Sequence, residues 1–184
     1  MPSDPVTTPA NPDPESAPPT VSPTVSPTWA LASAAAAAVA GSSALATLAT
    51  SLFGKALTVY LDGIPADRER FHDSLPALIV TPTENGHPQG GPVSHTVRAL
   101  LLADASAGSA TAGVPAQRQD GVRVLPGGRE LSTLASAIRD LLRDPATAIG
   151  SRVVDDSCEL DLVSSWPLRS ADLSITFEDI LAYA

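Results

Sequence analysis

The chain has 184 residues, with 11 Lys and Arg against 20 Asp and Glu, so its formal net charge is −9. This balance argues against a protein that holds duplex nucleic acid by neutralising phosphates, which needs clustered cations. It equally argues against electrostatic docking on an anionic membrane. The single cysteine, Cys158, excludes an intrachain disulfide framework and every zinc site built from several cysteines.

The first 28 residues are rich in proline. They hold nine of the 18 prolines and three acidic residues, with Ser, Thr, Val and Ala making up most of the rest. Proline fixes φ and lacks a backbone N–H, so this stretch favours neither a helix nor a sheet. Its apolar area is too small to offset the entropy of ordering it. We predict that residues 1–28 form a disordered or polyproline II arm.

Residues 29–42 are rich in alanine, and no charge occurs between Trp29 and Phe53. Because alanine is the best helix former, we expect a linker or helix over 29–42, with a break at Gly41–Ser43. The length would also fit a membrane span or a secretory signal. However, Ser and Thr residues make the run weakly hydrophobic and no basic residue precedes it, so a linker running into an ordinary helix is favoured.

The globular domain is predicted to span residues 43–184. Apolar residues at helical spacing predict a helix from Ser43 to about Gly54. Strands are predicted over 56–61 and 75–81, with one helical turn over 65–70 between them. A Gly/Pro-rich loop over 83–92 leads into a strand over 93–103, which would complete a hairpin.

The second half of this domain begins with an Ala/Gly/Ser-rich stretch, residues 104–121, which is typical of a long loop. A short strand is expected over 122–125. Residues 130–144 place five large apolar side chains on one helix face, and residues 153–163 and 172–178 alternate as strands. The predicted fold class is α+β: a mainly antiparallel sheet with two main helices packed on one face, preceded by the disordered Pro/Ala-rich N-terminal arm.

The sequence contains no recognisable arrangement of catalytic residues. The three histidines, His72, His87 and His95, lack metal-ligand spacing, and no Gly-x-Ser-x-Gly elbow occurs. Cys158 shares its predicted strand side with Leu160 and Leu162, so burial would disfavour its thiolate. We therefore expect no enzyme, no catalytic or metal-binding residues and no cofactor.

One acidic group remains open to several interpretations: Asp155, Asp156, Glu159 and Asp161. Glu159 and Asp161 project to the same face of their strand. The group could be a solvated strand face, bind a divalent cation or serve a metal-dependent enzyme. In a ring it could pair with Arg98, Arg139 or Arg143 of a neighbour, or line a channel through which DNA slides.

The last two predicted strands carry a recognisable pattern. Residues 162–178, Leu-Val-Ser-Ser-Trp-Pro-Leu-Arg-Ser-Ala-Asp-Leu-Ser-Ile-Thr-Phe-Glu, lead through a Ser/Trp turn and an Ala-Asp-Leu opening into a final strand. Residues 75–80, Leu-Pro-Ala-Leu-Ile-Val, precede a loop and the strand 96–102, and the helix 130–142 follows. Over residues 43–180 these features resemble the tail terminator proteins of long-tailed bacteriophages.

The resemblance implies a virion protein of the tail or neck, assembled in the host cytoplasm without a membrane. It would form a hexameric ring that caps the tail tube, stops tube polymerisation and offers a joining surface to a head-side connector protein. DNA would pass through the lumen without specific binding. The long arm and the loop 104–121 depart from the pattern and leave open another neck or connector protein, or a phage-like particle. The candidate ring or tube interface comprises Asn85, His87, Gln89, Arg98, Arg139, Arg143, Asp155, Asp156, Glu159 and Asp161.

Overall fold

The computed structural model describes residues 26–83, 94–104, 117–119, 122–124, 127–144, 147, 152–162 and 168–178. Of the predicted N-terminal arm, residues 1–25 lie outside the described part of the chain. All but the first residue of the predicted loop 83–92 also lie outside it.

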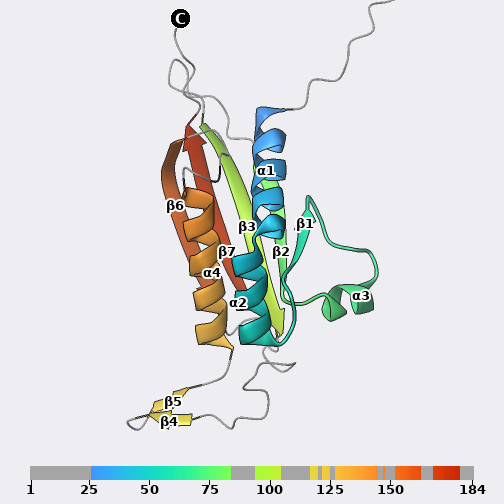
Figure 1. Ribbon diagram of the computed structural model, residues 1–184, viewed down its shortest axis with the longest axis vertical. Helices are drawn as coiled ribbons and strands as arrows, with labels where there is room; N and C mark the ends of the chain where they lie inside the picture. Colours follow the sequence, from blue (N-terminus) through green and yellow to red (C-terminus); the bar gives the residue numbers. More distant parts are fainter. Residues whose placement is uncertain are drawn as a thin grey trace, which may run out of the picture.

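Five strands form one sheet in the order β1-β2-β3-β7-β6 (Figure 1). Their neighbours pair antiparallel except β1 and β2, which run parallel. The α+β class with a mainly antiparallel sheet is therefore confirmed, as is the hairpin of the second and third strands. The bounds are β1 Thr58–Leu61, β2 Ala77–Thr83, β3 Ser94–Asp104, β6 Arg152–Asp161 and β7 Leu168–Glu178.

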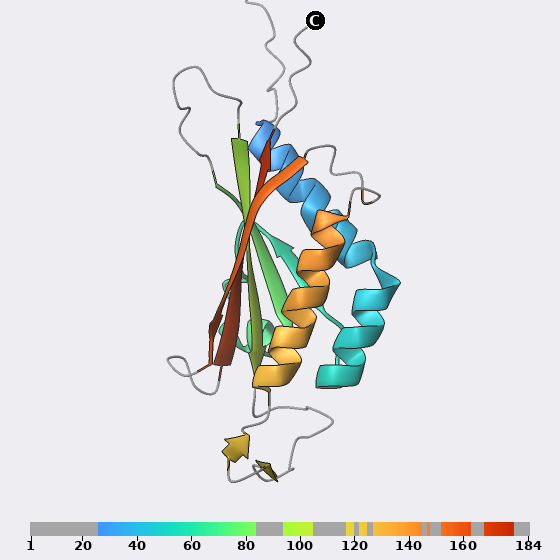
Figure 2. The same cartoon turned by 90° about the vertical axis from the view of Figure 1, so that its left-hand side faces the viewer.

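Three helices cover one face of this sheet: α1 (Pro27–Gly41), α2 (Ser43–Phe53) and α4 (Gly128–Arg143). In Figure 2 they lie on one side of the strands, and no described helix lies against β6 or β7 from the other side. Helix α3 (Arg68–Asp73) lies in the connection between β1 and β2. Among the described residues, β6 and β7 therefore have one face packed against helices and one face that no helix covers, called the open face below.

The Ala-rich run forms a helix that belongs to the core. Pro27 opens α1, where its missing N–H costs no helical hydrogen bond. The break falls at Ser42, whose hydroxyl accepts the amide hydrogen of Leu45 at 3.3 Å and so caps α2. Gly54, with φ of 72°, ends α2 in the left-handed region that suits glycine. The residues of α1 that are buried against the sheet and α4 are Thr28, Leu31, Ala32, Ala35, Ala36 and Val39.

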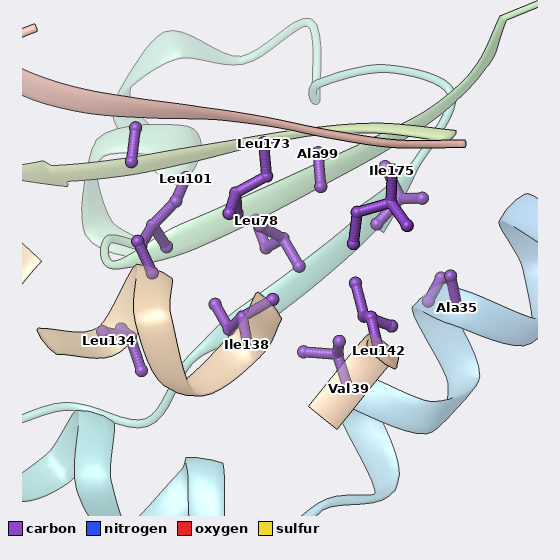
Figure 3. Close-up of a cluster of buried hydrophobic side chains, with 14 of the residues drawn as sticks. Ala35, Val39, Leu78, Ala99, Leu101, Leu134, Ile138, Leu142, Leu173 and Ile175 are labelled. Atoms are coloured by element: carbon purple, nitrogen blue, oxygen red, sulfur yellow. The ribbon is translucent and has the colours of Figure 1, made fainter. Parts of the chain in front are cut away.

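The core lies between the helices and the sheet (Figure 3). Leu134, Ile138 and Leu142 project from one face of α4, as the spacing predicts. They meet alternate residues of the central strands, which are Leu78, Ala99, Leu101, Leu173 and Ile175. Each large aliphatic side chain buried in this way contributes about 1.5–3 kcal/mol to the stability of the fold.

The prediction of a loop over residues 104–121 is wrong at both ends of that range. Asp104 is the last residue of β3, and Gln117–Gln119 forms β4, which pairs antiparallel with β5 (Val122–Val124). The short strand expected over 122–125 is thereby confirmed. Its partner was missed because a strand of three polar residues has no apolar alternation to reveal it.

No single helix in the described ranges is both long and apolar enough to cross a membrane. Helices α1 and α2 reach the required length and composition only as a pair, and the pair bends by 64° at its break.

Candidate assembly surface

The register of β6 against β7 divides the acidic group between the two faces of the sheet. Asp156 lies opposite the buried Ile175, so its side chain faces the helices. Asp155 lies opposite Thr176 and Glu159 opposite Asp172, so both face the open side. Asp161 follows Glu159 on that side, as the sequence predicts. The four carboxylates therefore do not converge on one site, which removes the geometric basis for a four-residue metal or acid–base centre.

On the helix side, Asp156 is paired within the chain. Its Oδ2 lies 3.5 Å from Nε of Arg139 and 3.6 Å from Nη1 of Arg143, one helical turn apart on α4. The Asp156 side chain is 18% exposed, which strengthens the attraction relative to a pair in bulk water. These three predicted interface residues thus tie the last helix to the edge strand.

On the open side, a shallow hollow of about 370 Å³ crosses the four strands β2, β3, β7 and β6. Arg98 of β3 forms an ion pair with Asp172 of β7, and Glu159 of β6 lies beside Asp172 in the next strand. Thr96 and Thr176 share a 3.0 Å hydrogen bond between their hydroxyls. The lining consists of Thr83, Thr96, Arg98, Ser157, Glu159, Asp172 and Ser174. This lining combines four hydroxyl groups with the cation of Arg98 and the carboxylates of Glu159 and Asp172.

Cys158 lies on the helix side of β6 and is half-buried rather than fully buried. Burial raises the pKa of its thiol; the nearby Arg139 guanidinium opposes this rise and Asp172 adds to it. A raised pKa keeps the sulfur protonated near neutral pH, so Cys158 is a poor nucleophile.

A second cluster was not foreseen from the sequence. Nε2 of His72 lies 3.0 Å from Oδ2 of Asp104, whose side chain is almost fully buried at the end of β3. They border a cavity of about 250 Å³ with Lys55, whose Nζ donates to the carbonyl of Asp73 at 3.2 Å. Residues 72 and 104 are brought together only by the packing of α3 near the end of β3, so no local pattern could signal this pair.

The remaining predicted interface residues lie in the loop 83–92. Asn85, His87 and Gln89 lie outside the described residues, and His95 is buried under α1 with Nδ1 2.7 Å from the Thr28 hydroxyl. Within the described ranges, no three His, Cys, Asp or Glu side chains are placed to hold a metal ion.

Comparison with solved structures found similarity to a virion protein chain. No protein-family model matches the chain, and no curated protein matches it. Among solved structures, a chain from the virion of a native gene transfer agent (GTA) particle is similar, with a TM-score of 0.47 and 15% sequence identity. The match covers 84% of this chain and 98% of that chain.

Proposed function

We propose that this chain is a structural assembly protein of a phage or phage-like particle, and specifically a tail terminator. Copies of it would form a hexameric ring on the end of the tail tube, stop its polymerisation and present a surface to the head-side connector protein. The proposal starts from the sequence pattern of residues 162–178 and 75–102. In the folded chain those stretches contribute the hairpin β2–β3 and the strand β7, which lie side by side in one sheet.

The observation that carries the proposal is the open face of the sheet at β7 and β6. Helices cover the other face, so the open face and its edge are available to a neighbour. Ring formation needs such surfaces, since a protomer in a ring makes a different contact on each side. The open-face residues Arg98, Asp155, Glu159 and Asp161 are the proposed ring contacts, although Arg98 also forms an ion pair with Asp172 of its own chain. Asp156, Arg139 and Arg143 instead pair with one another on the helix side.

In an alternative arrangement, with the open face turned toward the axis of the ring, the same carboxylates would line a channel for DNA instead. An acidic lumen repels phosphates and lets the duplex pass without binding. The residues of the loop 83–92, among them Asn85, His87 and Gln89, are proposed to contact the tube or the connector.

The test combines ring formation with tube capping. Light scattering after size-exclusion chromatography should give the mass of a hexamer for the full-length protein, and added protein should shorten tubes grown from purified tail tube subunits in electron micrographs. Arg98→Ala should weaken the ring, whereas Arg129→Ala, which changes an exposed arginine in the first turn of α4, should leave it intact. A strictly monomeric protein at high concentration that leaves tube length unchanged would overturn the proposal.

A further inference from the structure

Strand β6 forms an edge of the five-stranded sheet, and no described strand lies beyond it. An edge strand presents unpaired backbone N–H and C=O groups, which can template another strand. Along this edge Val154 and Leu160 are 47% and 42% exposed, two of the four large hydrophobic side chains that the described residues expose. The edge therefore offers both backbone hydrogen bonds and apolar area.

The C-terminal part of β6 is the part suited to pairing with an additional strand. The register with β7 is irregular between Val153 and Asp155 but continuous from Asp156 to Asp161. A bulge twists an edge away from further pairing, so strand addition is confined to the regular segment 156–161. There Leu160 faces the helix side, and Ser157 and Glu159 face the open side.

The β6 strand of a second copy fits that edge poorly. Pairing β6 with β6 of another copy would set the carboxylates at 155, 156, 159 and 161 against one another, which destabilises cross-strand pairs. The opposite edge, β1, is bordered by its connection to β2, whose helix α3 approaches it through the rings of Phe71 and Tyr60, 6.1 Å apart (Figure 1). The acidic charge thus acts against pairing of β6 with β6 of another copy and selects a strand of different composition.

We propose that segment 156–161 of β6 binds an extended segment of a partner protein, which adds to the sheet as its next strand. The partner segment carries Lys or Arg on the side that faces Glu159, and apolar residues on the side that covers Leu160. Backbone hydrogen bonds supply affinity and the alternating side chains supply the choice of partner. This inference concerns β6 alone and does not require that the chain form a ring.

The experiment measures hydrogen exchange of the full-length protein with three synthetic peptides. The first is Thr-Lys-Val-Arg-Val-Lys-Val-Thr with blocked ends. The second has Glu in place of each Lys and Arg, and the third keeps the basic residues but has Pro in place of two Val, which removes N–H donors without changing charge. The first peptide should slow exchange at 156–161 while leaving β2 unchanged, and should bind at least ten-fold tighter than the other two.

Matched variants distinguish binding at this edge from general attraction between the acidic protein and a basic peptide. Glu159→Lys should weaken binding of the basic peptide at least ten-fold, whereas Asp140→Lys, the same change of charge on the exposed side of α4, should change it less than two-fold. Circular dichroism spectra should show that both variants fold. A salt titration of the wild-type protein is a test that needs no variant, because rising salt should weaken its binding of the basic peptide.

Three results would overturn the inference: no slowed exchange at 156–161, equal binding of the acidic or proline peptide, or protection of these amides without peptide because a second copy covers them. Light scattering on the same samples reports on the ring separately. A monomer that binds the basic peptide ends the ring proposal and supports this one.

Discussion

The hydroxyl of Thr28 lies 2.7 Å from Nδ1 of His95, and both side chains are buried. This hydrogen bond joins the first turn of α1 to the start of β3, across 67 residues of sequence. A helix from the uncharged N-terminal run is thereby fixed to the central part of the sheet by a polar contact as well as by apolar packing.

Replacing Thr28 with valine tests this contact. Valine keeps the shape but cannot form the hydrogen bond, so Thr28→Val should lower the free energy of unfolding by about 1 kcal/mol and Tm by about 2–4 °C. Thr47→Val, at an exposed α2 position, is the control and should be nearly neutral. Thermal denaturation followed by circular dichroism measures both. Equal melting of Thr28→Val and wild type would contradict a stabilising role for this bond.

The packing of α1 can be tested by enlarging an alanine. Ala35 is fully buried and projects toward the sheet (Figure 3). Ala35→Leu should destabilise the protein by about 1–3 kcal/mol because a tightly packed core cannot absorb the added volume. The same change at the exposed Ala37 should alter stability by less than about 0.5 kcal/mol. Urea denaturation measures the difference, and similar effects at the two positions would mean that α1 does not pack in the core.

The ion pairs between β6 and α4 should contribute to stability. Asp156→Asn removes the charge that faces Arg139 and Arg143, so we expect a loss of about 1 kcal/mol. Asp155→Asn, one residue away on the open face, should be close to neutral. A double-mutant cycle with Arg139→Gln isolates the coupling energy. A coupling energy of zero would show that the pairs are not stabilising.

Cys158 should react slowly in the folded protein. Its pKa is raised mainly by burial, so the folded state holds the thiol proton to higher pH than the unfolded state does. The associated stability is fully present below the unfolded pKa of about 8.5 and is lost as pH rises toward the folded value. Labelling with an aromatic disulfide at pH 8 should be several-fold slower than in denaturant and should accelerate at higher pH. Equal rates in both states would contradict this.

Much of the fold can be predicted from local patterns. The apolar stripe of residues 130–144 identified α4 because a helix packed on one side must repeat its apolar residues at helical spacing. Alternation identified β6 and β7, and the Pro-bounded apolar run at 75–81 identified β2, since these strands are packed against helices on one face. The hairpin β2–β3 followed from two such strands in succession.

The role of the alanine run could not be read from composition. Its residues satisfy a linker, a span and a core helix equally, because alanine has high helix propensity and little apolar area. Contact with the sheet decides among these, and that contact depends on β1, β2 and β3, which follow later in the chain.

The candidate assembly surface was likewise predictable only in part from the sequence. From the sequence alone it follows that the segment 155–161 carries four carboxylates and that Glu159 and Asp161 share a face, since side chains alternate along a strand. Which face of the sheet they share depends on how β6 pairs with β7. Val153 packs against the core although it has the same parity as Asp155, and the irregularity between them turns Asp156 toward α4. A one-residue change of register reverses every side chain of a strand, and register is set by the paired strand rather than by local sequence.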